Sequence, residues 1–407
     1  MDFKKLTRGI FGGSVILLVT INIFNIINYF FHFFMVRMMT PADYGILAAL
    51  MSLVFIFTIP SESIQTIFTK YSSSEANKGK LKNIVKRAIK KLFNLSIIAF
   101  AIFALAALPL SRLLNINYLL VLFTGIFIIP TFIIPVSRGL MQGTKRFNAL
   151  GFNMIFEAVL KIILAISLVY FGFRVYGAIA GVILGSSVAI LLSFFSLRDI
   201  FFADEKKAET KLIYIYSLPI ITTVFVIMTF LYLDIIIARI VFAPEIAGYY
   251  AIASMIAKII FFGTLPISKV MFSISSSNEA KKKNKIIYYS AIILLLCVAA
   301  ALLLIYFLPD LFVRIFSGRY ISEVSNILIY VSLATSLISI TNLILLYKIS
   351  LGEIKNYYAL ILFLAVEVAL LFIFRHNLFE YSIAFVTASA IFLWGSTMLL
   401  GKQSVKF

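Results

Sequence analysis

The chain alternates between long apolar runs and short polar connections. Residues 10–36, for example, carry no acidic or basic side chain other than one histidine. A helix needs roughly 20 apolar residues to cross the roughly 30 Å hydrocarbon layer of a bilayer. Runs of that kind occur at 10–36, 41–67, 92–114, 116–137, 148–172, 175–197, 212–238, 247–272, 287–308, 324–346, 357–374 and 381–400. The pattern predicts an all-α integral membrane protein with twelve transmembrane helices. The first run follows basic residues, as in a signal peptide, but it is too long for a signal segment, so we expect it to be the first span.

The composition agrees with this class. Hydrophobic residues make up 62% of the 407 residues and charged residues 13%, and the mean hydropathy is +1.06. A water-soluble globule cannot bury so much apolar surface. The single cysteine, Cys297, lies in an apolar run, and the only histidines, His32 and His376, are far apart. We therefore expect no disulfide framework, no metal centre and no cofactor.

The distribution of charge predicts the topology. The formal net charge of +19 would indicate a nucleic-acid partner in a soluble protein. Here, however, the basic residues gather between apolar runs, and eight of them lie between Lys70 and Lys91. Alternate connections hold few basic residues, all of them arginine. By the positive-inside rule both termini are cytoplasmic, in agreement with an even number of spans.

Hydropathy and charge together predict a multi-pass protein of the cytoplasmic (plasma) membrane, with membrane lipids and no nucleic acid as partners. The basic spacing from Lys82 to Lys91 either reflects topology alone or also lies along an anionic lipid surface.

The connections leave no room for a soluble enzyme domain. The longest, 68–91, is too short for a catalytic or ATP-hydrolysing domain. The segment closest to a phosphate-binding loop, "GSTMLLGKQS" from Gly395, has one residue too many between its glycines and Gln403 where Ser or Thr is required. We expect a protein that is not an enzyme and that draws on an ion gradient, the membrane potential or the substrate gradient.

Two pairs of segments indicate an internal repeat. "RMMTPADYGILAAL" from Arg37 and "RIVFAPEIAGYYAI" from Arg239 share an arginine followed by Pro-x-x-x-Gly. "GTKRFNALGFNMIFE" (Gly143–Glu157) resembles "GEIKNYYALILFLAVE" (Gly352–Glu367). Because both matches occur in the same order, the sequence predicts a duplication.

The repeat predicts two six-helix lobes, 1–203 and 204–407. Six spans per lobe bring both lobes into the membrane from the same side, so the repeat is parallel, with a pseudo-two-fold axis along the membrane normal. Transporters of this kind usually place the substrate route between the lobes and alternate access by rocking them.

Several cations fall within or at the ends of the apolar runs, where charge is costly unless it faces protein or water. The candidates for binding a substrate headgroup are Lys161, Lys258, Lys269, Arg37 and Arg239. A cationic cavity suits an anionic cargo such as a phosphate or pyrophosphate. The alternatives are pairing with another helix for Lys258 and Lys269, or snorkelling to the inner interface for Lys269, and interfacial anchoring for the two arginines.

Four acids in the apolar runs are candidates for coupling to H⁺ or Na⁺, or for holding the cations: Glu157, Glu367, Glu62 and Asp234. Glu157 and Lys161 also have the spacing of a self-contained helical ion pair. In the repeat, Glu157 aligns with Glu367, whereas Lys161 aligns with Leu371. The asymmetry favours Lys161 as the contact for cargo and Glu157 as its partner.

A polar stripe marks the first run. Asn22, Asn25, Asn28 and His32 recur every three or four residues and so share one helical face. The stripe predicts either the lining of a wet cavity or hydrogen bonding between helices.

Four segments resemble a known family. They are "RGLMQGTKRFNALGFNMIFEAVLKIIL" from Arg138, "YGAIAGVILGSSVAILL" from Tyr176, "YLDIIIARIVFAPEIAGYYAIASMIAKI" from Tyr232 and "LFVRIFSGRYISEVSNIL" from Leu311. In this order they are similar to the polysaccharide flippases of the multidrug/oligosaccharidyl-lipid/polysaccharide (MOP) exporter superfamily.

The resemblance implies two six-helix lobes around a central cavity and the transfer of a lipid-linked oligosaccharide to the outer leaflet. It also implies a polyprenyl phosphate or pyrophosphate carrier and glycan-assembly proteins as partners. The positions that match the family motifs, which we interpret as mainly structural, are Arg138, Gly139, Gln142, Gly143, Asp234 and Arg239. With twelve spans the chain lacks the two additional helices typical of peptidoglycan-precursor flippases.

Two rival functions predict different features. An ion-coupled exporter of cationic drugs needs an acidic cavity, and such proteins often carry an acid in the first helix, where this chain has none. A membrane glycosyltransferase or ligase needs a sizeable outer loop with catalytic acids, and the sequence has no such loop.

Overall fold

The computed structural model describes residues 3–75, 77–208, 218–275, 283–351 and 357–399. Side chains are described from residue 19 onward, except at 57, 58, 60, 62, 63, 74, 218–220, 273, 274, 283–285 and 399. Within these ranges every regular element is a helix. The all-α prediction is confirmed for the described part of the chain.

The helices form two compact units. Unit 1 comprises Met1–Met38 and Phe57–Ile215, and unit 2 comprises Met39–Ile56 and Tyr216–Phe407. The sequence placed the division after residue 203 and kept 39–56 in the first half. In the structure, helix α2 (Pro41–Ser74) contributes its first part to unit 2 and the rest to unit 1.

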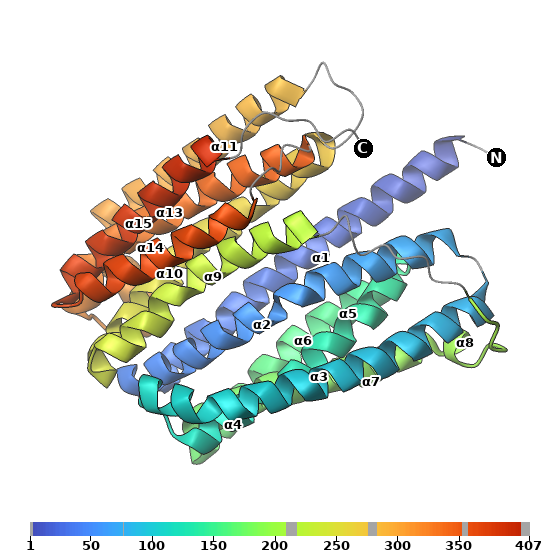
Figure 1. The fold of residues 1–407 in the computed structure, drawn as a ribbon, viewed down its shortest axis with the longest axis horizontal. Helices are drawn as coiled ribbons and strands as arrows, with labels where there is room; N and C mark the ends of the chain where they lie inside the picture. The colour runs from blue at the N-terminus through green and yellow to red at the C-terminus, as the bar shows by residue number, and fades with distance from the viewer. Residues whose placement is uncertain (1–2, 76, 209–217, 276–282, 352–356, 400–407) are drawn as a thin grey trace. The chain divides into compact units, whose positions relative to one another are not determined.

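Unit 1 is built from long apolar helices joined by short turns (Figure 1). Asn77 caps α3, since its side chain accepts hydrogen bonds from the backbone N–H groups of Gly79 and Lys80. Asn115, in a left-handed conformation, ends the same helix. Besides the second part of α2, the helices are α1 (Phe3–Met38), α3 (Lys78–Leu114), α4 (Tyr118–Gly125), α5 (Ile128–Gly143), α6 (Phe147–Leu168), α7 (Arg174–Ser196) and α8 (Arg198–Phe201).

Helices α6 and α7 form an antiparallel hairpin. The chain turns in the π-helical segment Val169–Phe173, where Gly172 adopts φ +91°, a conformation that glycine reaches without strain. As one straight helix, the 50-residue apolar stretch Phe147–Ser196 would measure about 75 Å, far more than a bilayer core. The turn therefore divides it into two membrane-length helices.

The spacing of glycines on α7 explains how closely this hairpin packs. Gly177, Gly181 and Gly185 recur every four residues and face α6. A Cβ atom at Gly181 would lie 2.6 Å from the backbone nitrogen of Ala165, closer than packed atoms approach. Small residues at this spacing allow two membrane helices to approach closely without a bulky side chain between them.

Unit 2 has its own helical core, in which α10 packs against α13 and α13 against α15. Gly45 of α2 meets Gly248 of α10, and a Cβ at Gly45 would lie 3.0 Å from the backbone of Gly248. The glycines of the repeated Pro-x-x-x-Gly motif are thus in contact. The other elements of unit 2 are α9 (Leu218–Val241), α10 (Pro244–Ser275), α11 (Lys283–Phe307), α12 (Pro309–Ser317), α13 (Ser322–Ser350), η4 (Tyr357–Leu360), α14 (Ile361–Ile373) and α15 (Leu378–Leu399).

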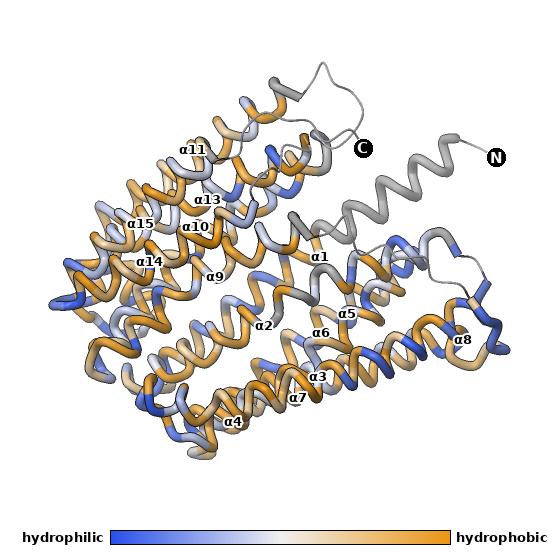
Figure 2. The backbone as a smooth tube through the Cα atoms, in the orientation of Figure 1, coloured by the Kyte–Doolittle hydropathy of each residue, from blue (hydrophilic) through white to orange (hydrophobic). Residues whose placement is uncertain are grey.

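Among the described residues, nine helical stretches are long and apolar enough to cross a membrane, and the α6–α7 hairpin counts as one of them. Two shorter apolar stretches add to these: Pro41–Ile56, which is the first part of α2, and Tyr357–Ile373, which comprises η4 and α14. Figure 2 shows hydrophobic positions along most of each helix and hydrophilic positions toward the helix ends. The protein is a multi-pass membrane protein.

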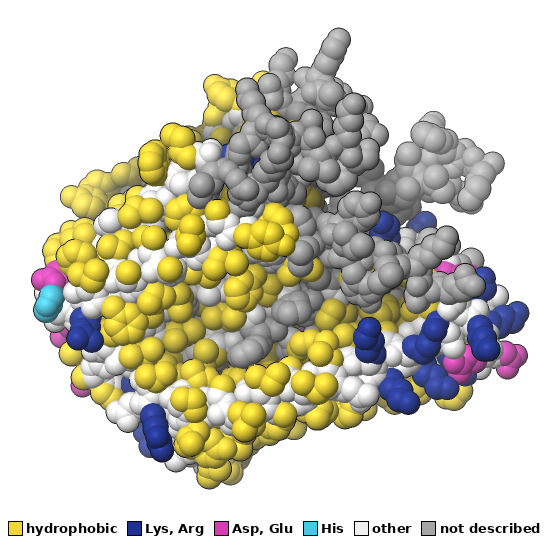
Figure 3. Space-filling model, in the orientation of Figure 1, with side chains coloured by type: hydrophobic (Ala, Val, Ile, Leu, Met, Phe, Trp, Pro, Cys, Tyr) yellow, Lys and Arg dark blue, Asp and Glu magenta, His cyan; other side chains and the backbone are white. Residues whose placement is uncertain are grey.

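Basic side chains gather at the α8 end of unit 1 (Figure 3). Arg146 donates two hydrogen bonds of 2.7 Å to Asp199, and Lys78 pairs with the same carboxylate at 2.8 Å. The Arg146 guanidinium, helped by Lys78, holds the pKa of Asp199 well below its usual range. Lys86, together with Asn83, likewise lowers the pKa of Glu205. These contacts fasten the chain after α7 to the start of α3.

Candidate functional site

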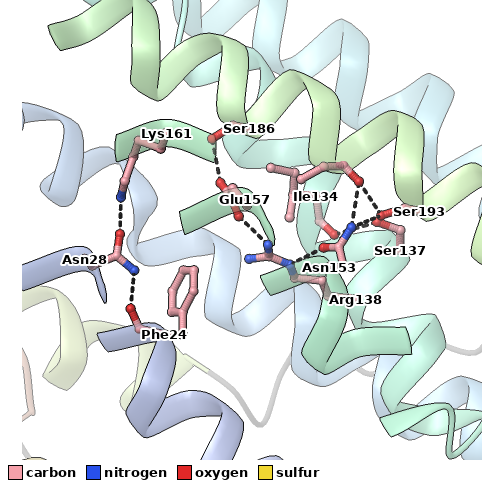
Figure 4. Close-up of polar contacts among 11 residues, drawn as sticks. Phe24, Asn28, Ile134, Ser137, Arg138, Asn153, Glu157, Lys161, Ser186 and Ser193 are labelled. Carbon is pink, nitrogen blue, oxygen red and sulfur yellow. Dashed lines mark hydrogen bonds and ion pairs between the residues drawn. The ribbon is translucent and has the colours of Figure 1, made fainter. Parts of the chain in front are cut away.

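A buried charge network joins α5, α6 and α7 (Figure 4). Arg138 of α5 donates hydrogen bonds to Glu157 and, at 3.0 Å, to Asn153, both on α6. Ser186 of α7 donates to the other oxygen of Glu157 at 2.6 Å. Both charged side chains are about nine-tenths buried. Removing one partner of such a pair typically costs about 3–5 kcal/mol, so the network stabilises unit 1.

Further contacts surround Asn153 and the Arg138 guanidinium. Asn153 donates to the backbone oxygen of Ala189 at 2.8 Å and to the hydroxyl of Ser193 at 3.1 Å. The Arg138 guanidinium also lies over the ring of Phe24, 5.6 Å from its centre. A cation this well compensated is poorly placed to bind an incoming anion.

Lys161 lies one helical turn beyond Glu157 and contacts a different helix. Its ammonium donates to the side-chain oxygen of Asn28 on α1, and it lies 5.3 Å from the centre of the Phe31 ring. Asn28 in turn donates to the backbone oxygen of Phe24 at 2.8 Å. The described ion pairs join Glu157 to Arg138 and not to Lys161. Lys161 is thus held by a neutral amide and a ring, so no ion pair within the described residues cancels its charge.

A second cluster lies in unit 2, where Lys258 of α10 pairs with Asp234 of α9 at 3.2 Å. Ser254 lies between them, since it donates to Asp234 at 2.6 Å and accepts from Lys258 at 2.8 Å. Tyr250 also donates to the carboxylate, at 3.2 Å. The Lys258 side chain is 1% exposed. Of the alternatives that the sequence left open, the structure shows Lys258 paired with another helix.

Glu367 of α14 completes this second cluster. It is fully buried, and neither carboxyl oxygen has a hydrogen-bond partner among the described residues. It lies close enough to Asp234 and Lys258 to interact with their charges. The unit 2 cluster therefore has one cation and two carboxyl groups, whereas the unit 1 cluster (Arg138, Glu157 and Lys161) has two cations and one carboxyl group.

The other predicted site residues are not members of these two clusters. Arg37 is exposed, with its guanidinium 4.2 Å from the centre of the Phe33 ring, and Lys269 is exposed on α10. Arg239 is buried near the end of α9. Within the polar stripe of α1, Asn22, Asn25 and Asn28 are half-buried and His32 is buried. The side chain of Glu62 lies outside the described residues.

The partner of Glu157 was not among the predictions from sequence. Arg138 was assigned to a mainly structural motif, and only Lys161 was considered as the cation for Glu157. A usable signal was present, because Arg138 and Asn153 lie at similar distances from the tight turn between α5 and α6. Residues placed in this way about a turn face each other across an antiparallel helix pair. Glu157 follows Asn153 by one helical turn, within reach of the long arginine side chain.

These elements can be compared with known proteins. A family model described as "Polysaccharide biosynthesis protein" matches residues 11–279, well over half of the chain. The chain belongs to the polysaccharide biosynthesis protein family. No curated protein matches the sequence.

Solved structures confirm the fold. An inward-facing multidrug resistance MATE family transporter of the MOP superfamily matches with a TM-score of 0.69 and 16% identity, over 92% of this chain and 94% of that chain. "Lipid II flippase MurJ, inward closed conformation" matches with a TM-score of 0.68 and 17% identity, over 95% and 87%. A MOP superfamily transporter from Pyrococcus furiosus, whose description refers to reverse polarity of the binding pocket, matches with a TM-score of 0.60 and 16% identity, over 97% and 95%.

The predicted resemblance is confirmed for the family, and the solved structures confirm the fold. The chain is thus an all-helical membrane protein of the polysaccharide biosynthesis protein family, and its fold is similar to the folds of these transporters.

Proposed function

We propose that this polysaccharide biosynthesis protein is a flippase for lipid-linked oligosaccharide. The cargo is carried on a polyprenyl phosphate or pyrophosphate and crosses the cytoplasmic membrane by alternating access. The observation that carries the proposal is Lys161, a cation in a membrane-length helix whose only described hydrogen-bond partner is a neutral amide. A phosphate group supplies the charge that this site lacks.

The contacts of the other cations support this choice. Arg138 and Lys258 are each neutralised by a carboxylate in an ion pair, so neither offers a vacant positive charge. An ammonium on a flexible stem binds phosphate as a point charge and adapts to a moving headgroup. We retain Arg37, Arg239 and Lys269 as further headgroup contacts along the route.

The proposed topology is twelve spans in two six-helix lobes, with both termini cytoplasmic. Each predicted run overlaps a helix or a pair of consecutive helices of the structure. The turn at Gly172 and the shorter apolar stretches Pro41–Ile56 and Tyr357–Ile373 supply the crossings beyond the nine long stretches.

We assign cation coupling to the unit 2 cluster. With Asp234 and Lys258 paired, Glu367 adds an uncompensated carboxyl group in a fully buried position. Burying an isolated charge is costly, so this group requires a proton or another cation. A proton or Na⁺ taken up there and released on the other side would drive the transport cycle.

Complementation of a flippase-deficient strain tests the function. The wild-type gene is expected to restore surface glycan and to clear the accumulated lipid-linked intermediate, which is identified by mass spectrometry. Lys161→Ala removes a charge-assisted contact worth about 1.5–3 kcal/mol. It is expected to lower export about 10- to 100-fold.

The control is Lys90→Ala, which removes an exposed lysine from α3. Normal export by Lys161→Ala at equal protein level would refute the cationic site. Efflux of cationic drugs without clearance of the lipid intermediate would instead establish the rival function, an ion-coupled antiporter of the multidrug type.

A further inference from the structure

The hydrogen bonds of Asn28 fix the orientation of its amide. The side-chain oxygen accepts from Lys161, and the side-chain nitrogen donates to the backbone oxygen of Phe24 one turn earlier in α1 (Figure 4). The side-chain oxygen is therefore directed at the ammonium, and the group that presents it carries no net charge.

This arrangement differs from those of the other cations in the two clusters. Arg138 meets the carboxylate of Glu157, and Lys258 meets that of Asp234. In the part of the chain that the structure describes, Lys161 donates its hydrogen bond to a neutral amide, whereas Arg138 and Lys258 each pair with a carboxylate. An amide and a carboxylate have nearly the same shape, so the difference between the sites is one of charge.

We propose that Asn28 is a positioning residue that sets the polarity of the Lys161 site. It holds the ammonium at the α1–α6 contact and leaves its positive charge available to an anionic phosphate headgroup. This inference rests on the proposed function, because it assumes that Lys161 meets the cargo.

Neither aspartate nor alanine at position 28 would both hold the Lys161 ammonium in place and leave its charge available. Aspartate would keep the contact and strengthen it, but it would cancel the charge of Lys161. Alanine would leave the charge but release the ammonium, which could then turn toward Glu157 one helical turn away on α6. Only a neutral acceptor satisfies both requirements.

The test compares Asn28→Asp with Asn28→Ala in the full-length protein. If Asn28 sets polarity, Asn28→Asp should unfold within a few degrees of wild type or above it, yet lose export as fully as Lys161→Ala. Asn28→Ala should lose less export than Asn28→Asp. A purely structural role predicts the opposite order, since aspartate preserves the contact and alanine removes it.

The matched control is Asn117→Asp, which adds the same charge at the exposed N-cap of α4, where aspartate caps a helix as well as asparagine does. It should export close to wild type. Wild-type export by Asn28→Asp, or equal loss in Asn28→Asp and Asn117→Asp, would overturn the inference.

A binding measurement separates this inference from the proposed function. Geranylgeranyl pyrophosphate, titrated onto the purified protein in nanodiscs, is expected to bind at least 10-fold more weakly to Asn28→Asp and to Lys161→Ala. If Lys161→Ala binds and exports normally, the proposed anion site fails. If Lys161→Ala fails in both assays while Asn28→Asp performs normally in both, only the role of Asn28 is refuted.

Discussion

Individual buried charges in this protein are compensated by their contacts to different degrees. Arg138 and Glu157 form a hydrogen-bonded ion pair, as do Lys258 and Asp234. Pairs of this kind stabilise a fold and offer little to a ligand. Lys161 and Glu367 remain without an opposite charge in direct contact among the described residues. Because uncompensated charge in a membrane is costly, these two residues are the ones most expected to bind cargo and coupling ion.

At this scale Glu367→Gln tests the coupling proposal. Glutamine keeps the size of the side chain and mimics its neutral form, so the protein should fold normally. Transport should fall at least 10-fold and should no longer change when a protonophore or a Na⁺ ionophore collapses the gradient. The measurement is uptake of a fluorescent lipid-linked glycan into proteoliposomes.

Glu380→Gln is the matched control, because Glu380 is an exposed acid that contacts His376 and Asn377 at the start of α15. It should behave like wild type. A Glu367→Gln protein with unchanged gradient dependence would contradict the assignment of coupling to Glu367.

At the scale of elements, small residues decide how the helices meet. The glycine spacing on α7 sets its close contact with α6, and Gly45 and Gly248 set the contact between α2 and α10. The α6–α7 contact also positions the charge network, because Glu157 and Lys161 of α6 lie opposite Ser186 and Gly185 of α7. The packing of these two helices is therefore a condition for the geometry of the site.

Gly181→Leu tests this packing. The new side chain would begin 2.6 Å from the backbone of Ala165, so α6 and α7 would have to separate. Overpacking of this kind costs typically about 1–3 kcal/mol or more. The melting temperature in detergent should fall by about 1–4 °C, and export should be lost.

Gly263→Ala provides the control within another long membrane helix, α10, because a Cβ at Gly263 meets no atom within 4 Å. Its melting temperature should stay the same or rise slightly, since alanine favours a helix over glycine. An unchanged melting temperature for Gly181→Leu would contradict the close α6–α7 packing.

At the scale of the whole molecule, the lengths of the apolar segments and the positions of the basic residues together predict the topology. Apolar length defines the membrane segments, and basic residues mark one side of the membrane. The basic start of α3 and the contacts of Asp199 and Glu205 lie at the same end of unit 1. The proposed topology places that end in the cytoplasm.

Accessibility labelling tests the topology. Cys297 is first replaced by serine, and single cysteines are then introduced at Lys90 and at Arg319, both exposed positions. In intact cells an impermeant maleimide should label the cysteine at 319 and spare the one at 90. In inside-out vesicles the order should reverse. Labelling of both sites from the same side would refute the arrangement of spans.

The sequence by itself determined the membrane class, the all-α fold, the positions of the apolar helices and the family. These properties depend on local length, hydropathy and motif order, which do not require knowledge of distant contacts. It also identified Glu157, Lys161, Asp234, Lys258 and Glu367 as unusual, since a charge in an apolar run is conspicuous without a structure.

Only the tertiary structure decided which of these charges are neutralised. Helical spacing favoured an ion pair between Glu157 and Lys161. In the structure α5 packs so that Arg138 pairs with Glu157, and Lys161 instead donates a hydrogen bond to Asn28. Contacts between helices also group residues 39–56 with unit 2, and the predicted division after residue 203 stays a prediction. The physical reason is that a pairing across helices depends on the rotation and approach of each helix, which packing against its neighbours sets and no single helix encodes.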